Sequence, residues 1–420
     1  RWAQEGLLPR IEWRQESAKP AQMLQAIDEL ADRLMKDQPR PTELGQTLVN
    51  MINGSANRAP MDMDWLKLWN HKAELFEIDC SVFERPRDCA EVVVKTLFTL
   101  CCSCLVVYEL ARSRKPTELM AIDPVTVRRV TLALEDLKKI NYVEAIDLVI
   151  ESLHQLPDDQ SLNQVLASLY DTIACNIDVL RYSGWEVLAY IYQRLLSETF
   201  RKAYATFYTK LPAAHLLARL AVGRRQMRIV DPAMGSGSLL LASFYARQWL
   251  DLADASIYEK QDEPALDYLA KKALADTVGL DALRGSVALT AAVLSIASLA
   301  VPRDRLKLHQ VPVDLESSGS LELLNPQSTL FPHAREAVKD GFDLVIMNPP
   351  FTRSDRISTI VGESARKKLL ACDLSFGGVP LHDIFAAGMA KPFLALADRI
   401  VKPGGTIAAV LPNSILGRPA

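Results

Sequence analysis

The sequence predicts an α/β fold, a doubly wound parallel sheet, preceded by an all-helical N-terminal domain. Two observations lead to this prediction. From about residue 206, short β-rich runs alternate with helical runs five times, a pattern typical of parallel sheets. Residues 1 to about 205 show helical periodicity and little strand-like alternation. We therefore expect a helical domain over residues 1–195 and an α/β domain over residues 196–420.

The expected strands are short apolar runs that end in loop-forming residues. They cover residues 228–230, 277–280, 308–313, 342–347 and 406–411, the last directly after Pro403-Gly404-Gly405. An inserted helix is expected within residues 251–276, and loops or insertions over 315–341 and 352–380. A helix is expected over residues 383–401, and Pro392 should kink or split it.

In the N-terminal region, apolar residues recur at helical spacing. Leu24, Ile27, Leu30 and Leu34 predict a helix over residues 21–36, and a similar stripe predicts one over residues 142–156. Ser183 and Glu186 form a capping-box pattern, which predicts a helix start before residues 187–196.

Composition excludes several classes of protein. The chain has 420 residues, enough for two or three domains. It is 49% hydrophobic and 24% charged, which excludes a largely disordered, collagen-like or coiled-coil protein. The net charge of −3 excludes a polycation. Nucleic acid would therefore have to bind at a local patch or through a partner.

The seven cysteines lack the repeated spacing of a zinc site. Cys101, Cys102 and Cys104 lie in an apolar run without a nearby histidine, so we expect buried, reduced thiols; a metal or redox role is the alternative. No metal site is expected elsewhere. Reduced thiols fit a cytoplasmic location.

No membrane partner is expected either. The first residues carry charges and no apolar run, unlike a signal peptide. The uncharged stretch 96–108 has 13 residues, too few to cross a bilayer. The uncharged stretch 285–302 is rich in Ala, Ser and Thr, which favours a helix buried against a sheet.

The first chemical motif is Asp231-Pro232-Ala233-Met234-Gly235-Ser236-Gly237, between the first strand and a helix that starts near Ser238. Gly235 and Gly237 let the backbone approach a ligand and adopt positive φ. The helix N-terminus favours a carboxylate or phosphate. Leu240 stands where a complete dinucleotide motif has its last glycine, so a dinucleotide site or a purely structural turn are weaker alternatives.

Two further motifs follow later strands. Asp281 ends the second strand, where an acid can accept the two hydroxyls of a ribose, or simply cap the next helix. Asn348-Pro349-Pro350-Phe351 follows an apolar strand. The Asn348 side-chain oxygen and the Pro349 carbonyl offer two acceptors for an exocyclic amine, and Phe351 offers a face for a planar base. A rigid turn is the alternative for this motif alone.

With Asp231–Gly237 and Asn348–Phe351 together, the sequence resembles the N6-adenine DNA methyltransferases, above all the modification (methyltransferase) subunit of type I restriction–modification systems. The segment Thr206 to Pro212 resembles the Phe-Tyr-Thr-Pro segment of that family, with Lys210 in place of its proline. The resemblance implies a class I S-adenosylmethionine-dependent methyltransferase with a Rossmann-like sheet. It also implies that residues 196–420 form a methyltransferase domain truncated at its C-terminus.

The resemblance also assigns roles. Asn348, Pro349, Pro350 and Phe351 would be catalytic. The residues that would bind S-adenosyl-L-methionine are Phe207, Tyr208, Thr209, Asp231, Ala233, Gly235, Ser236, Gly237, Asp281 and Ser320. Ser320 stands where the family has the acid that meets the cofactor adenine, and Asp314 is the competing candidate.

The expected reaction is methyl transfer to N6 of adenine in DNA, within a restriction–modification or related phage-defence system. The expected partners are DNA and a specificity subunit or a missing C-terminal target-recognition region. Arg353, Arg356, Arg366, Lys367 and Lys368 would meet DNA phosphates or form a solvated loop. The alternatives are methylation of RNA or of a protein glutamine amide, and a non-catalytic assembly subunit with the same fold.

Overall fold

The computed structural model describes most of the chain between residues 41 and 412. The chain divides into two compact units, Arg1–Pro39 and Arg40–Ala420, and only the second is described. The gaps within it are residues 59–62, 141–143, 155, 158, 196–208, 253–262, 298–305, 315, 351–362, 373, 377–378 and 381–387. The helix predicted over residues 21–36 lies outside the described residues, as do Phe207, Tyr208 and Phe351.

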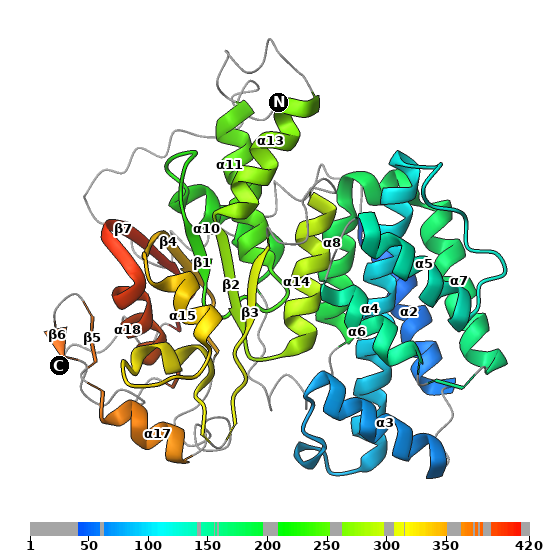
Figure 1. Cartoon of the computed structure of the whole chain (residues 1–420), viewed down its shortest axis with the longest axis horizontal. Coiled ribbons are helices and arrows are strands. Elements are labelled where there is room, and N and C mark those ends of the chain that lie inside the picture. The colour runs from blue at the N-terminus through cyan, green and yellow to red at the C-terminus, as the bar shows by residue number, and fades with distance from the viewer. Residues whose placement is uncertain are drawn as a thin grey trace. The chain divides into compact units, whose positions relative to one another are not determined.

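A five-stranded parallel sheet carries the second half of the chain (Figure 1). Its strand order is β3-β2-β1-β4-β7, and each neighbouring pair runs parallel. The strands are β1 (Ile229–Asp231), β2 (Thr277–Asp281), β3 (Lys307–Gln310), β4 (Phe342–Met347) and β7 (Val401–Ala409). The predicted parallel sheet is confirmed, and its first four strands lie within three residues of the predicted bounds.

Each face of the sheet packs into its own hydrophobic core. Side chains of a strand alternate between faces, so Ile229 and Leu344 enter one core while Val230 and Val345 enter the other. The first face is covered by α10 (Leu211–Ala221), α11 (Ser238–Leu252) and α14 (Arg284–Ala297), and the second by the 3₁₀ helix η3 (Gly319–Leu324), α15 (Pro332–Val338) and α18 (Ala390–Ile400). Both faces are covered, as expected for a doubly wound sheet.

The prediction for the last strand was wrong at its start. β7 begins at Val401, five residues before the predicted start, and includes the Pro-Gly-Gly segment. Val401 pairs with Phe342, and Thr406 pairs with Leu344, so β7 advances five residues while β4 advances two. The extra residues bulge out of the ladder, which lets Pro403, without an N–H, occur inside an edge strand.

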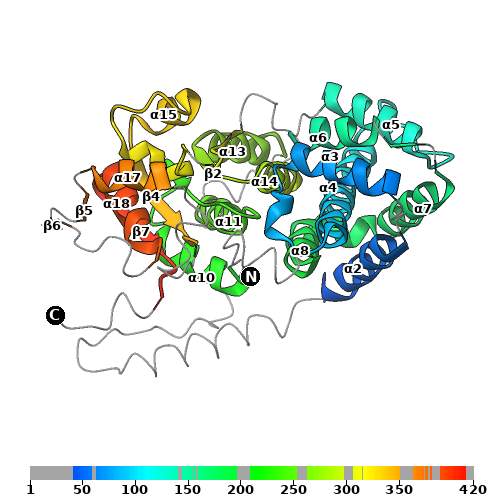
Figure 2. The same cartoon turned by 90° about the horizontal axis from the view of Figure 1, so that it is seen from below.

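Helices make up the described part of residues 41–195 (Figure 2). They are α2 (Pro41–Arg58), α3 (Met63–Phe76), α4 (Pro86–Arg114), α5 (Val127–Ile140), α6 (Glu144–His154), α7 (Gln160–Cys175) and α8 (Ile177–Leu195), with a short 3₁₀ helix η1 (Cys80–Val82). The predicted helix over residues 142–156 corresponds to α6. A domain boundary at residue 195 stays a prediction.

The capping-box prediction at Ser183 was wrong. Ser183 lies inside α8, which starts at Ile177 after α7. Its hydroxyl donates to the Val179 carbonyl four residues earlier, at 2.8 Å. A serine in mid-helix commonly makes this bond to its own helix, so the Ser-x-x-Glu spacing does not mark a helix start here.

α4 is the central helix of this part of the chain. Among the described residues it is the one helix long and apolar enough to cross a membrane, with a mean hydropathy of 1.9 over 18 residues. However, 89% of that window is buried inside the protein. α4 packs against α3, α8 and α14, so its apolar surface is covered by other helices. The predicted burial of residues 285–302 is confirmed for α14, which lies between the sheet and the helices (Figure 1).

The prediction of reduced cysteines is confirmed only in part. Cys101, Cys102 and Cys104 are free and buried in α4, as expected. Cys80 and Cys89 instead form a disulfide, with their Cα atoms 5.4 Å apart. The pairing joins η1 to the start of α4, nine residues later, and the sequence offers no spacing signal for it.

The remaining elements lie around the sheet. The predicted inserted helix is α13 (Glu263–Ala275), and the two predicted loop regions contain η3, α15, α17 (Glu363–Leu370) and the hairpin strands β5 (Ser375–Phe376) and β6 (Val379–Pro380). Pro392 is the third residue of α18. In the first turn its missing N–H has no intrahelical partner to lose, so it stands near the helix start and causes no break in the described residues 390–400.

Candidate active site

The sheet topology brings two of the predicted motifs to adjacent positions. β1 and β4 are neighbours, with Ile229 paired with Leu344 and Val230 with Val345. β2 and β3 lie on one side of β1, and β4 and β7 lie on the other. Between β1 and β4 the strand order therefore reverses, which is where doubly wound sheets bind ligands at their carboxyl ends. Asp231 ends β1, and Asn348 directly follows β4.

The loop after β1, residues 231–237, is named the glycine loop below. Gly235 and Gly237 have φ values of +54° and +77°, in the region that favours glycine. A Cβ at Gly237 would lie 2.7 Å from Thr290 Cγ2 on α14. The positive φ predicted for Gly235 and Gly237 is confirmed, and Thr290 leaves no room for a side chain at Gly237.

Asp231 is the buried acid of the glycine loop, with 1% of its surface exposed. Its Oδ1 accepts a hydrogen bond from the Ala233 N–H at 2.9 Å, while Oδ2 has no hydrogen-bond partner among the described residues. Burial, with a smaller contribution from the charge of Asp281, raises the pKa of Asp231 to about 8. A buried acceptor without a donor is costly, so this side of the loop fits a ligand that carries an ammonium or another donor.

Asp281, in contrast, is already engaged by the protein. Its Oδ2 accepts the Gly235 N–H and its Oδ1 accepts the Leu283 N–H, both at 2.9 Å. The Ser286 hydroxyl and the Ala282 N–H also hydrogen-bond this carboxylate. Burial nevertheless raises its pKa above the ordinary value. Since a carboxylate has about four acceptor positions, a ribose hydroxyl that bound here would share the carboxylate with these donors or replace one of them.

The two candidates for the cofactor-adenine position differ in their surroundings. The Ser320 hydroxyl donates to the Pro232 carbonyl at 2.6 Å, which joins η3 to the glycine loop. Asp314 instead caps its own turn, with Oδ1 accepting the N–H groups of Glu316 and Ser317 at 2.7 and 2.8 Å. Of the two, Ser320 is therefore the one that contacts the predicted site.

The Asn-Pro-Pro motif extends from a buried strand. All of β4 except Asp343 is buried, and the Val410 N–H donates to the Met347 carbonyl at 3.0 Å, which continues the sheet to the end of the strand. Asn348 is half-buried and Pro349 is buried. In the Phe-Tyr-Thr segment, Thr209 is described. It is buried just before α10, which contacts β4 and β7.

Of the basic residues proposed to meet DNA, Arg353 and Arg356 lie outside the described residues. Lys368 forms an ion pair with Glu316 at 2.6 Å, and Lys367 lies 3.3 Å from Glu363 on its own helix. Both lysines are therefore paired within the protein, and a DNA phosphate would have to compete with a carboxylate for each.

The sequence analysis missed three residues that are connected to the glycine loop by hydrogen bonds: Thr290, Ser286 and, through Ser286, Tyr192. Thr290 Oγ1 donates to the Gly235 carbonyl at 2.9 Å, and Ser286 hydrogen-bonds Asp281. They lie on helices whose sequences show only an apolar pattern, so no local signal identifies them. In the described ranges, no group of three or more His, Cys, Asp or Glu side chains could hold a metal ion.

The fold and site together define a doubly wound α/β protein with a candidate ligand site at its topological switch point. Neither a protein-family model nor a curated protein matches the sequence. Similar solved structures include the methyltransferase subunit of a type I restriction–modification system from Streptococcus thermophilus, with 19% identity over 90% of this chain and 76% of that chain, at a TM-score of 0.42.

Two other similar structures are larger proteins or assemblies. A DrdV–DNA complex shows 12% identity over 94% of this chain and 36% of that chain, at a TM-score of 0.49. A structure of a type I restriction–modification system shows 13% identity over 70% of this chain and 56% of that chain, at a TM-score of 0.37.

Proposed function

We propose that this chain transfers a methyl group from S-adenosylmethionine to N6 of adenine in DNA, as part of a restriction–modification or related phage-defence system. One observation supports this most. The Asp231 and Asn348 motifs are 117 residues apart in the sequence (348 − 231), yet they follow neighbouring strands at the switch point. A cofactor bound by one motif and a base bound by the other would therefore meet.

In this proposal the glycine loop holds the amino-acid end of the cofactor. Asp231 Oδ2 accepts from the ammonium group, which supplies the donor that this buried oxygen lacks within the described protein. Gly235 and Gly237 keep the loop free of side chains close to the ligand. Asp281 accepts a ribose hydroxyl beside its present donors or in place of one of them, and Ser320 lies near the adenine. When bound, the cofactor supplies an activated methyl group on a sulfonium.

Asn348 and Pro349 orient the target amine. Their two oxygens accept the two N6 hydrogens, which leaves the nitrogen lone pair directed at the methyl group. The adenine must leave the duplex to reach this loop, at a cost of a few kcal/mol, and Phe351 stacks on the flipped base. On transfer the N–CH₃ bond would form as the S–CH₃ bond breaks, and one N6 proton would then leave to water. The same proposal includes DNA and a specificity subunit or target-recognition region as partners, and a cytoplasmic location.

The test separates cofactor binding from chemistry. The purified chain is incubated at stoichiometric concentration with labelled S-adenosylmethionine and with DNA, RNA or protein, and the modified product is identified by mass spectrometry. We expect N6-methyladenine in DNA. Asn348→Ala should retain cofactor affinity by calorimetry and lose at least about 100-fold in methyl transfer, the scale of losing one positioned polar group.

Asn50→Ala is the matched control, since the exposed Asn50 on α2 accepts only a hydrogen bond from Gln46 in the described contacts, at 2.9 Å. It should leave both quantities unchanged. Label in RNA or in glutamine would replace the substrate proposed here. Cofactor binding without transfer to any substrate would favour a non-catalytic assembly subunit.

A further inference from the structure

We propose that Tyr192 on α8 is a positioning residue for the glycine loop, acting through Ser286 and Asp281. This inference rests on the proposed function, because the loop is assigned there to the cofactor. It adds a residue from the helical half of the chain to a site whose other described residues belong to the second half, from Thr209 onward.

Hydrogen bonds hold Gly235 at both its backbone N–H and its carbonyl. Its N–H donates to Asp281 Oδ2, and its carbonyl accepts from Thr290 Oγ1, each at 2.9 Å. Asp281 ends β2 and Thr290 lies on α14. A glycine has no side chain to fix its conformation, so these two bonds determine how the Gly235 peptide units face a ligand.

Further polar contacts connect Asp281 to α8. Ser286 hydrogen-bonds the Asp281 carboxylate, and the oxygens of Ser286 and Tyr192 lie 3.2 Å apart. Either hydroxyl of the Tyr192–Ser286 pair can be the donor. When Ser286 donates its single proton to Asp281, Tyr192 supplies the proton of this pair, because a carboxylate only accepts. The contacts lead from Tyr192 through Ser286 to Asp281, which accepts the Gly235 N–H.

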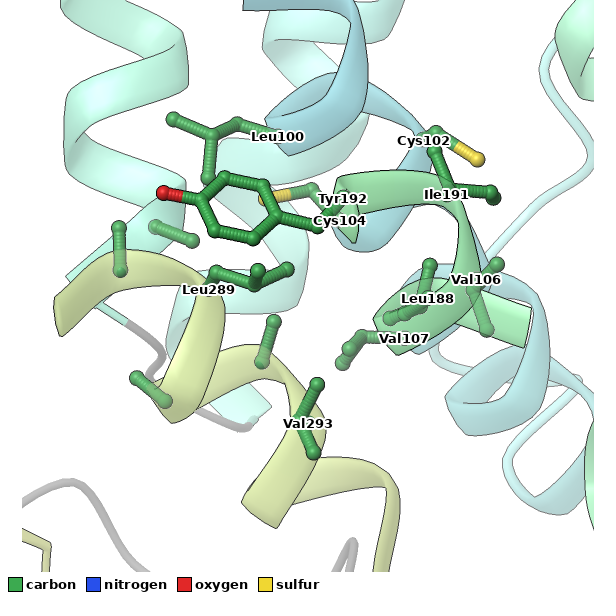
Figure 3. Close-up of a cluster of buried hydrophobic side chains, with 14 of the residues drawn as sticks. Leu100, Cys102, Cys104, Val106, Val107, Leu188, Ile191, Tyr192, Leu289 and Val293 are labelled. Atoms are coloured by element: carbon green, nitrogen blue, oxygen red, sulfur yellow. The ribbon is translucent and has the colours of Figure 1, made fainter. Parts of the chain in front are cut away.

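Tyr192 and Ser286 are both buried among packed side chains. Ser286 is fully buried, and only 3% of Tyr192 is exposed. In Figure 3 the Tyr192 ring lies among Leu100 and Cys104 of α4 and Leu289 of α14. A buried hydroxyl needs a partner, and hydrogen bonds in such surroundings are electrostatically stronger than in water. The packed ring therefore fixes the position of its hydroxyl next to Ser286.

The segment that contains Ser286 is also held by two other helices. Arg284 donates to the Leu75 carbonyl of α3 at 3.3 Å and lies 3.6 Å from Glu151 of α6. Gln310, at the end of β3, hydrogen-bonds Glu77, just after α3, and lies 3.4 Å from the Ala282 carbonyl. The turn between β2 and α14 is thus anchored to α3, α6 and α8, which makes the conformation of the glycine loop depend on the helical half.

The experiment measures the affinity for S-adenosylmethionine by calorimetry in four variants of the chain: Tyr192→Phe, Ser286→Ala, the double variant, and Tyr190→Phe. The Tyr190 control lies two residues away on α8, and its hydroxyl bonds Gln46 on α2 at 2.7 Å, away from the loop. Tyr192→Phe keeps the ring and removes only the hydroxyl. We expect it to lower affinity about 3- to 10-fold, the scale of one hydrogen bond.

Two further readouts distinguish positioning from general stability. The double variant should bind no more weakly than Ser286→Ala alone, because residues in one network are not additive. The Tyr192→Phe variant should raise the KM for the cofactor while kcat at saturating cofactor stays unchanged. Tyr190→Phe should leave affinity and KM unchanged.

Unchanged affinity in Tyr192→Phe, with or without a lower melting temperature, would overturn the inference and leave the proposed function standing. Additive losses in the double variant would overturn it as well, since the two residues would then act independently. Failure of the wild-type chain to bind the cofactor at all would overturn the proposed function, and the inference with it.

Discussion

Asp231, the acid at the end of β1, can be tested through the pH dependence of the free energy of unfolding. In wild type, burial raises the pKa of Asp231 from its ordinary 3.8 to about 8. The folded chain therefore binds more protons than the unfolded chain between about pH 4 and pH 8. Stability should fall as pH rises through this window and level off above pH 8. Asp231→Asn keeps the shape of the side chain but does not titrate, so it should not show this loss.

The magnitude follows from the pKa difference. Within the window, each pH unit changes the free energy of unfolding by about 1.4 kcal/mol for one group. Between pH 5.5 and pH 7.5 the wild type should therefore lose up to about 3 kcal/mol relative to Asp231→Asn. Urea unfolding of both proteins at the two pH values measures this difference, in the absence of ligand.

Asp343→Asn is the control. Burial of Asp343 opposes ionisation, but the hydrogen bond from the Arg228 N–H and the charges of Lys402 and Arg224 together hold its pKa below the ordinary value. Its contribution is present above the unfolded pKa and is lost only as the pH falls below about 4. The difference between wild type and Asp343→Asn should thus be constant from pH 5.5 to pH 7.5. A constant difference for Asp231→Asn as well, within about 0.5 kcal/mol, would refute the raised pKa.

Two other predictions concern packing. Gly237→Ala should destabilise the chain by about 1–3 kcal/mol in urea unfolding, because φ is +77° and the new Cβ would lie 2.7 Å from Thr290 Cγ2. The control Gly54→Ala, at a position in α2 with open space around it, should be neutral or stabilising. Equal effects of the two substitutions on stability would contradict the geometry. Burial raises the pKa of the α4 thiols, to about 12 for Cys102. Alkylation of the native protein, followed by mass spectrometry, should therefore label the exposed Cys175 and leave Cys101, Cys102 and Cys104 unmodified. Labelling of any of these three in the native protein would contradict their burial.

Much of the sheet was predictable because its strands carry strong local signals. β4 has the predicted bounds, residues 342–347, since an apolar run there ends directly in Asn-Pro-Pro. β7 was predicted too short because Pro403, Gly404 and Gly405 are turn residues by local propensity. Val401, two residues before Pro403, belongs to β7 because it pairs with Phe342. A single sequence carries no signal for such a tertiary contact.

The candidate site, like the sheet, could be predicted from the sequence only in part. The motifs that follow strands could be found, since an acid or a glycine after an apolar run is visible locally. The role of Asp281 as an acceptor for the Gly235 N–H was missed, because that contact spans 46 residues. The bond between Tyr192 and Ser286 spans 94 residues, and nothing near either residue indicates the other.

The burial of α4 has a consequence for synthesis. On a ribosome, this hydrophobic helix is made before most of the elements that cover it. The last of them, α14, begins about 170 residues after α4 ends at Arg114. At roughly 5–20 residues per second, that delay is on the order of 10–30 seconds. For that time a nascent segment as apolar as a membrane span is only partly covered, so the growing chain should be a substrate for chaperones that bind exposed hydrophobic helices.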